Sequence, residues 1–158
     1  CDKTVKGCHT AILEYNLEGS DPIYGVLKNC SALTTKNAVF RSAVRQGLYQ
    51  LRVEVCQKDG CNKTPLQFPP INKQLNGVKC PYCNATNALT CEADGDVECF
   101  GEMTNCIYMA ATFYRSVAPP VEFSAFRGCT SAKSTKDYPE ILSNRVQDIT
   151  TLEISNGV

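Results

Sequence analysis

Two cysteines in the segment KCPYCN (79–84) have a spacing that three kinds of chemistry use. Cys80 and Cys83 are separated by Pro81 and Tyr82. A pair of this kind can be a dithiol redox centre, half of a zinc site, or two cysteines that form disulfides with different partners. The secondary structure predicted around the motif and the positions of the other cysteines distinguish these three possibilities.

The surroundings of this motif disfavour the redox and zinc interpretations. In glutaredoxins, which use Cys-Pro-Tyr-Cys, the motif follows a strand and opens a helix. Here it follows a proline-rich stretch, and the run NATNALTCEADGDVEC after it is a poor helix. Zinc needs four ligands, but Cys91 and Cys99 are eight residues apart and the only histidine, His9, lies in the other half of the chain. We therefore favour separate disulfides for Cys80 and Cys83.

The composition indicates a secreted, extracellular protein. Eleven of the 158 residues are cysteine, which is typical of an oxidising compartment. Three N-x-[ST] sequons begin at Asn29, Asn62 and Asn84. The net charge is zero, so nothing favours a nucleic-acid partner. No apolar run reaches the ~18–20 residues of a transmembrane segment, and the opening on Cys1 predicts a mature or trimmed form.

The remaining polar residues form no catalytic constellation. His9 follows Cys8 with no arranged serine or thiol partner, so we interpret it as a structural or surface residue. The run CEADGDVECFGE (91–102) holds five acidic residues, and the spacing of Asp94, Asp96 and Glu98 could suit calcium. Its ligand set is incomplete, and a solvated acidic edge is favoured. We predict no enzyme, no cofactor and no metal.

The chain contains an internal duplication. Cys1 and Cys8 are seven residues apart, as are Cys99 and Cys106, and CHTAILEY in the first half matches CIYMAATFY in the second. The stretch between the halves has three prolines and no cysteine. We therefore predict a first domain over 1–62, an extended linker over 63–79 and a second domain over 80–158. Both domains are expected to be incomplete, the first at its start and the second at its end.

The expected fold is all-β. β-branched and aromatic residues after Cys8 and Cys106, and over 23–30, 48–56 and 121–129, predict strands separated by turn residues. The stretch SAVRQGLYQL (42–51) is a weak helix candidate that Gly47 interrupts.

The cysteine spacing resembles a known family. Cys-x2-Cys-x7-Cys-x7-Cys-x6-Cys from Cys80, followed by a hairpin and Cys129, resembles the three-finger (snake-toxin-like) domain of urokinase-receptor and lymphocyte-antigen (LU) proteins. CQKDGCN resembles that domain's closing motif. The linker LQFPPINKQLNGVKCPYC and the stretch MTNCIYMAATF resemble two-domain secreted members, above all gamma-type phospholipase inhibitors and also sodefrin-precursor-like proteins. The resemblance implies two tandem disulfide-rich three-finger domains.

The resemblance also implies a disulfide pairing and an account of the odd cysteine count. The implied pairs are Cys1–Cys30, Cys56–Cys61, Cys80–Cys106, Cys83–Cys91 and Cys99–Cys129. Cys8 is left unpaired within this segment, because its family partner would lie upstream. The family's bridge in the third finger, 33–53, is missing here, so we expect that finger to be more mobile.

The resemblance implies a protein-binding module that acts through its finger tips. The tips are 15–25 and 114–123, and the anchor types within them are Tyr24, Tyr114, Arg115 and Phe123. The expected partner is another protein, with a secreted phospholipase as the leading example. The alternatives are a structural or self-assembling extracellular protein, or a secreted pheromone-like signal.

Glycans and charge complete the sequence-based expectations. We expect a glycan on Asn84, which we place on a loop, a variable one on Asn29, and little on Asn62, because in the family the matching asparagine bonds the backbone. Residues 1–62 carry eight basic and six acidic residues, and 80–158 carry five and ten. The basic residues Lys36, Arg41 and Arg45 could therefore meet the acidic stretch 92–102 between neighbouring molecules.

Overall fold

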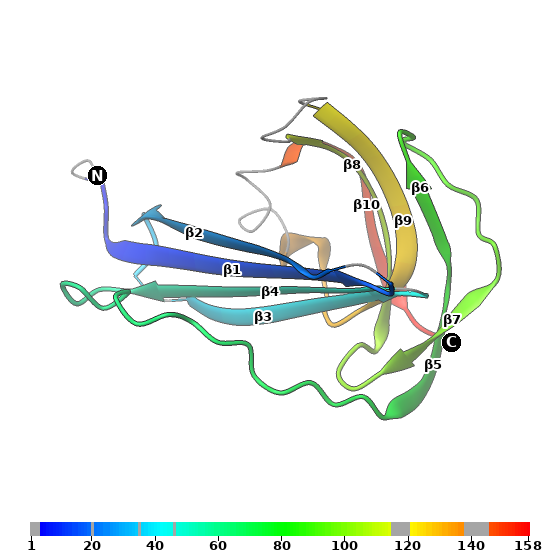
Figure 1. Ribbon diagram of the computed structural model, residues 1–158, viewed down its shortest axis with the longest axis horizontal. Coiled ribbons are helices and arrows are strands. Elements are labelled where there is room, and N and C mark those ends of the chain that lie inside the picture. Colours follow the sequence, from blue (N-terminus) through cyan, green and yellow to red (C-terminus); the bar gives the residue numbers. More distant parts are fainter. Residues whose placement is uncertain (1–3, 20, 35, 46, 115–120, 138–145) are drawn as a thin grey trace. The chain divides into compact units, whose positions relative to one another are not determined.

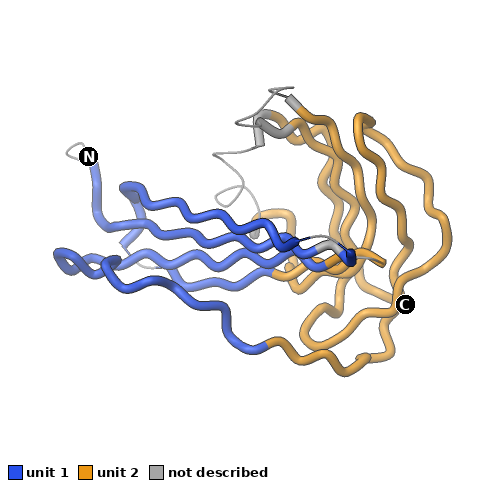
Figure 2. Tube along the Cα trace, in the orientation of Figure 1, with its two compact units in different colours: residues 1–40, 48–70 blue, residues 41–47, 71–158 orange. Residues whose placement is uncertain are grey.

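The computed structural model of the chain describes residues 4–19, 21–34, 36–45, 47–114, 121–137 and 146–158. These residues contain ten strands and one short 3-10 helix, joined by turns and loops (Figure 1). The fold is therefore all-β, as the sequence predicts. The chain divides into two compact units, residues 1–40 with 48–70 and residues 41–47 with 71–158, coloured blue and orange in Figure 2.

Unit 1 is built around three strands in the order β4-β1-β2. These are β1 (Gly7–Leu17), β2 (Ile23–Ser31) and β4 (Gly47–Cys56), and β3 (Lys36–Val44) lies next to β4 in the strand order. β1 and β2 form an antiparallel hairpin in which Cys8 lies opposite Cys30. Leu51, Val53 and Val55 alternate along β4 and are buried, as expected for a strand with one face toward the core.

Unit 2 contains a larger sheet and a separate pair of strands. The sheet has the order β10-β8-β9, formed by β8 (Asn105–Tyr114), β9 (Val121–Thr130) and β10 (Val146–Asn156), and β6 (Cys83–Thr86) pairs with β9. β5 (Leu75–Pro81) and β7 (Asp96–Phe100) form a two-stranded sheet. The 3-10 helix η1 spans Thr135–Asp137.

The two units repeat the same hairpin. Cys106 lies opposite Cys129 across β8 and β9, as Cys8 lies opposite Cys30 across β1 and β2. The third strand of each unit, β4 or β10, is next to the first strand of its hairpin in the strand order. The duplicated cysteine spacing therefore corresponds to a duplicated strand arrangement.

The core of unit 2 combines small residues and cystines with a few larger side chains, Met103, Ile107 and Met109. Ala110, Ala111 and Ala125 on β8 and β9 have no exposed surface, and Met103 is fully buried. Small side chains bury little apolar area each, so covalent bridges have to replace part of the missing core.

Two expectations about local structure are wrong. Leu75–Lys79 belongs to β5, so the predicted linker 63–79 overlaps the first strand of unit 2. Asn76 and Gly77 are residue types that usually indicate a turn, so the sequence did not predict this strand. Gly77 has a positive φ of 84° and lies at an irregularity in the β5–β7 pairing. The weak helix candidate at 42–51 instead contains the end of β3 and the start of β4.

Candidate functional site

The CPYC motif contains no dithiol. Cys80 is bonded to Cys106 and Cys83 to Cys91, so each cysteine of the motif has a different partner. Cys80, Cys99 and Cys129 lie close enough to suggest a metal site, with sulfurs within 4.8 Å of one another. All three are in disulfides, however, and a cystine sulfur offers no thiolate for a metal.

The disulfides gather at the buried end of unit 2. Cys99 is bonded to Cys129, and its sulfur lies 3.5 Å from that of Cys80 in the neighbouring bridge. In unit 1, Cys56 is bonded to Cys61, and Cys30 is also in a disulfide. The expected partner of Cys30 is Cys1, which lies outside the described residues. Among the described cysteines only Cys8 is free.

These bridges join the strands that form each finger. In unit 2, Cys80–Cys106 links β5 to β8, and Cys99–Cys129 links β7 to β9. The hairpin β8–β9 and the pair β5–β7 thus extend from one cystine cluster, and β10 pairs with β8. The chain has a disulfide-rich three-finger fold.

Comparisons with known proteins add little to this assignment. No protein-family model and no curated protein matches the chain. Among solved structures, the crystal structure of mouse TEX101 is similar over 99% of this chain and 84% of that chain, with 16% sequence identity and a TM-score of 0.41. The fold assignment rests on the strands and disulfides themselves. Within the part of the chain that the structure describes, no helix has the length and apolar character to cross a bilayer.

The tip of the β1–β2 hairpin carries a group of exposed apolar side chains. Ile23, Tyr24 and Val26 at the start of β2 expose 55%, 67% and 69% of their surface. Glu14, opposite Tyr24 on β1, accepts a hydrogen bond from Gln50 Nε2 at 3.1 Å. The group therefore combines an apolar centre with a polar neighbour, as protein-binding surfaces do. We call Ile23, Tyr24 and Val26 the β2 tip.

The equivalent tip of unit 2 is only partly described. Phe123 on β9 is 42% exposed and lies opposite Thr112 on β8. Tyr114 ends β8, and Arg115 lies outside the described residues. Of the four predicted anchors, Tyr24 and Phe123 are therefore exposed. Ile23 and Val26 were not predicted, because their exposure depends on the position of β2 at the end of the unit 1 sheet.

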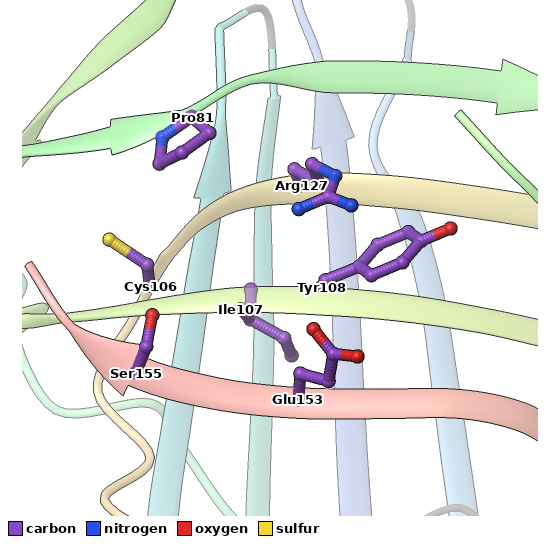
Figure 3. Close-up of a pocket in the computed structure, with 7 residues that line it drawn as sticks. All are labelled: Pro81, Cys106, Ile107, Tyr108, Arg127, Glu153 and Ser155. Atoms are coloured by element: carbon purple, nitrogen blue, oxygen red, sulfur yellow. The ribbon is translucent and has the colours of Figure 1, made fainter. Parts of the chain in front are cut away.

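A shallow hollow on unit 2 is lined by side chains from β5, β8, β9 and β10 (Figure 3). The guanidinium of Arg127 on β9 lies 3.7 Å from the ring centroid of Tyr108 on β8, and Glu153 on β10 is opposite Tyr108. The other lining residues are Pro81, Cys106, Ile107 and Ser155. The volume is about 80 Å³, well below the ~300–1,000 Å³ that small-molecule sites enclose.

The basic residues 41 and 45 are engaged inside unit 2. Arg41 forms an ion pair with Glu102, and its side chain is 4% exposed. Arg45 lies over the ring of Tyr82 at 5.0 Å. The sequence analysis placed these arginines opposite the acidic stretch of a neighbouring molecule, but Arg41 reaches that stretch within its own chain. Long-range strand pairing, which the sequence does not reveal, brings them together.

Backbone contacts fix the segment that carries these arginines. Ser42 and Ala43 pair with Thr130 and Cys129 on β9, and Ser42 Oγ donates to Thr130 Oγ1 at 3.1 Å. A Cβ on Gly128 would lie 2.2 Å from the carbonyl oxygen of Ala43. Glycine at 128 is therefore required for this close approach.

The acidic run lies on the surface of unit 2, and His9 lies on a strand of unit 1. Asp94, Asp96 and Glu98 are exposed, and among the described residues their carboxylates belong to no close group of metal ligands. Lys79 forms an exposed ion pair with Glu98 at 3.6 Å. His9 lies on β1 opposite Asn29.

The three sequon asparagines lie in different settings. Asn84 is exposed on β6, so its predicted loop position is wrong. Asn29 is exposed on β2, and its Oδ1 accepts a hydrogen bond from the Cys30 N–H at 2.8 Å. Asn62 lies in a turn, and its carbonyl oxygen accepts a hydrogen bond from Lys28 Nζ. Among the described residues no hydrogen bond of its carboxamide is present, and low occupancy of Asn62 stays a prediction.

Proposed function

We propose that this protein is an extracellular, non-catalytic binding module that contacts another protein through the β2 tip. The observation that carries the proposal is the exposure of three large apolar side chains at one end of one hairpin. Tyr24 and Val26 are two residues apart on β2, so they project from the same face. Clustered exposed apolar residues mark interaction sites more often than single ones do.

The chemistry of the chain supports binding over catalysis. The cysteines of the CPYC motif are in separate disulfides. Disulfides also favour an oxidising, extracellular setting. The hollow beside Arg127 is too small for a typical small-molecule ligand. The β2 tip, with three exposed large apolar side chains close together in sequence, is the surface that we assign to binding.

The proposed partner is a secreted phospholipase. The support for this choice is the resemblance of the linker and of MTNCIYMAATF to gamma-type phospholipase inhibitors. An inhibitor needs no reactive group, because an aromatic anchor seated in a partner's apolar entrance is enough to block substrate access. Tyr24 is the anchor that we assign to this role.

Inhibition of secreted phospholipases A2 tests this function. Purified glycoprotein is titrated against a panel of these enzymes, with hydrolysis of phospholipid vesicles as the readout. We expect a stoichiometric loss of activity with at least one enzyme, and a Tyr24→Ser variant that folds normally but inhibits weakly. If no enzyme is inhibited at tens of micromolar, the phospholipase assignment is wrong.

The structure weakens one argument for the alternative of a self-assembling protein. Its charge argument paired the arginines of one molecule with the acidic stretch of the next, and Arg41 is already paired with Glu102. Nothing in the described residues favours a pheromone-like signal over a binding module. Light scattering in low and high salt distinguishes assembly from binding, because a monomer under both conditions rules assembly out.

A further inference from the structure

Two of the three sequons lie on strands that form the ends of sheets. Asn29 is on β2, which ends the strand order of unit 1 and pairs only with β1 among the described strands. Asn84 is on β6, which pairs only with β9 among the described strands. Both asparagines are exposed. Asn62 lies outside any strand, in the turn after the closing cysteine.

The same two strands lack the charges that usually protect a sheet edge. An edge strand presents unpaired backbone groups, and native proteins block such edges with charged residues or prolines. β6 has the sequence CNAT, with no charge and no proline. β2 has one charge, Lys28, and its ammonium is bound to the carbonyl oxygen of Asn62.

The third edge of the large sheet provides the contrast. β10 ends the sheet of unit 2 on the other side and carries Asp148 and Glu153, both exposed. β10 has no sequon. Sequons thus occur on the two charge-poor edges, and carboxylates occur on the edge without one.

We propose that N-glycans on Asn29 and Asn84 protect the edges of β2 and β6 against strand addition by a second copy of this chain. An added strand would lie about 4.8 Å away, so its backbone would run directly past the glycosylated side chain. A branched glycan at that point fills the space the added strand needs. Strand addition is more favourable at β2 than at β6, because the exposed Ile23, Tyr24 and Val26 would give an added strand apolar contacts.

The proposal also limits how a partner reaches the β2 tip. Val26 and Asn29 are three residues apart, which is about 10 Å along a strand. A glycan on Asn29 blocks pairing along the length of β2 but leaves the side chains at its start accessible. Partners therefore contact the side chains of the tip and do not extend the sheet.

The test compares the three sequons in the full chain secreted by a eukaryotic host. Glycopeptide mass spectrometry first measures occupancy at each site. Asn29→Gln, Asn84→Gln and the double variant are then compared with Asn62→Gln by light scattering at tens of micromolar. We expect the first three to shift from one copy to two or more, most strongly the double variant, and Asn62→Gln to remain monomeric.

Two further samples separate edge protection from effects on folding. Enzymatic removal of the glycans from the folded, purified protein should cause the same association. Asn29→Lys with Asn84→Lys should remain monomeric without glycans at these sites, because a lysine on an edge strand also disfavours pairing. A glycan that mattered only for folding would not be replaced by lysine.

Several results overturn the proposal. Bare Asn29 and Asn84 in the secreted protein exclude it at once. A deglycosylated protein that stays monomeric contradicts it, as does association of Asn62→Gln to the same extent as Asn84→Gln. If only one of the two edge sites is occupied, protection of the other edge is wrong.

Discussion

The ion pair between Arg41 and Glu102 should respond very differently to the removal of each partner. Arg41 is buried, with 4% of its side chain exposed, whereas the side chain of Glu102 is 43% exposed. Glu102→Gln leaves a guanidinium in a buried position without its carboxylate. Arg41→Met leaves a carboxylate that water can still reach and places an apolar side chain in the buried position.

The expected magnitudes follow from this asymmetry. Breaking a fully buried pair costs about 3–5 kcal/mol, and an exposed pair contributes about 0–1 kcal/mol. Because Glu102 is partly hydrated, we expect Glu102→Gln to lower the free energy of unfolding by about 1–2 kcal/mol. Arg41→Met and the double variant should both lie within about 1 kcal/mol of the wild type, because an apolar replacement of a buried pair is often neutral.

Urea unfolding of the oxidised protein, followed by far-ultraviolet circular dichroism, measures these differences. Glu98→Gln is the matched control, since the Lys79–Glu98 pair is exposed on both sides, and it should cost less than about 0.5 kcal/mol. A larger loss for Arg41→Met than for Glu102→Gln would refute the reasoning. So would a double variant whose loss equals the sum of the two single losses.

Three further predictions concern the scaffold of unit 2. Gly128→Val should release Ser42 and Ala43 from β9, seen as faster amide hydrogen exchange at these residues, because a Cβ at 128 would meet the Ala43 carbonyl oxygen at 2.2 Å. Asn76→Asp should lower the free energy of unfolding by about 1–3 kcal/mol in urea, because the Asn76 amide donates to the carbonyl oxygens of Gly101 and Met103. Replacing both cysteines of the 30-residue bridge Cys99–Cys129 by alanine should cost about 1 kcal/mol more than the same change in the 8-residue bridge Cys83–Cys91. The first prediction is contradicted if the amides at 42 and 43 stay protected from exchange. The second is contradicted if Asn76→Asp is as stable as the wild type, and the third if the loss of either bridge costs the same free energy of unfolding.

The cysteines and the β-branched runs contain most of the information about the fold. The match between Cys1-x6-Cys8 and Cys99-x6-Cys106 predicted a repeated unit, and the repeated hairpin has Cys8 opposite Cys30 and Cys106 opposite Cys129. The four disulfides between described residues join the pairs that the family resemblance implies for those eight cysteines. Cysteine spacing is informative because a bridge requires two particular residues to meet.

Strands without a regular pattern could not be predicted in this way. β5 contains Asn76 and Gly77, which are turn residues in most contexts, and a positive φ at Gly77 breaks the alternation of its side chains. The carboxamide of Asn76 satisfies the backbone there by bonding two carbonyl oxygens across 25 and 27 residues. Only the fold brings those groups together.

The candidate surface was predictable at the level of the hairpin but not of the residue. Tyr24 and Phe123 were selected because aromatic residues near turns are common anchors, and both are exposed. Ile23 and Val26 look like ordinary strand residues in the sequence, and their exposure follows from the position of β2 at the end of its sheet. The pairing of Arg41 with Glu102 depends on residues 61 positions apart, which no local pattern encodes.

The most direct test of the claim that the β2 tip is the contact surface is the affinity of the glycoprotein for a secreted phospholipase A2. Calorimetric titration measures this affinity for the wild type and for the Tyr24→Ser and Phe123→Ser variants. If the β2 tip is the contact surface, the wild type binds with one site per chain. Tyr24→Ser should then weaken binding by about 30-fold or more, the effect of losing a hot-spot residue worth ~2 kcal/mol. Phe123→Ser should change the affinity much less. Wild-type binding that Tyr24→Ser leaves unchanged, or no binding at all, would contradict the account.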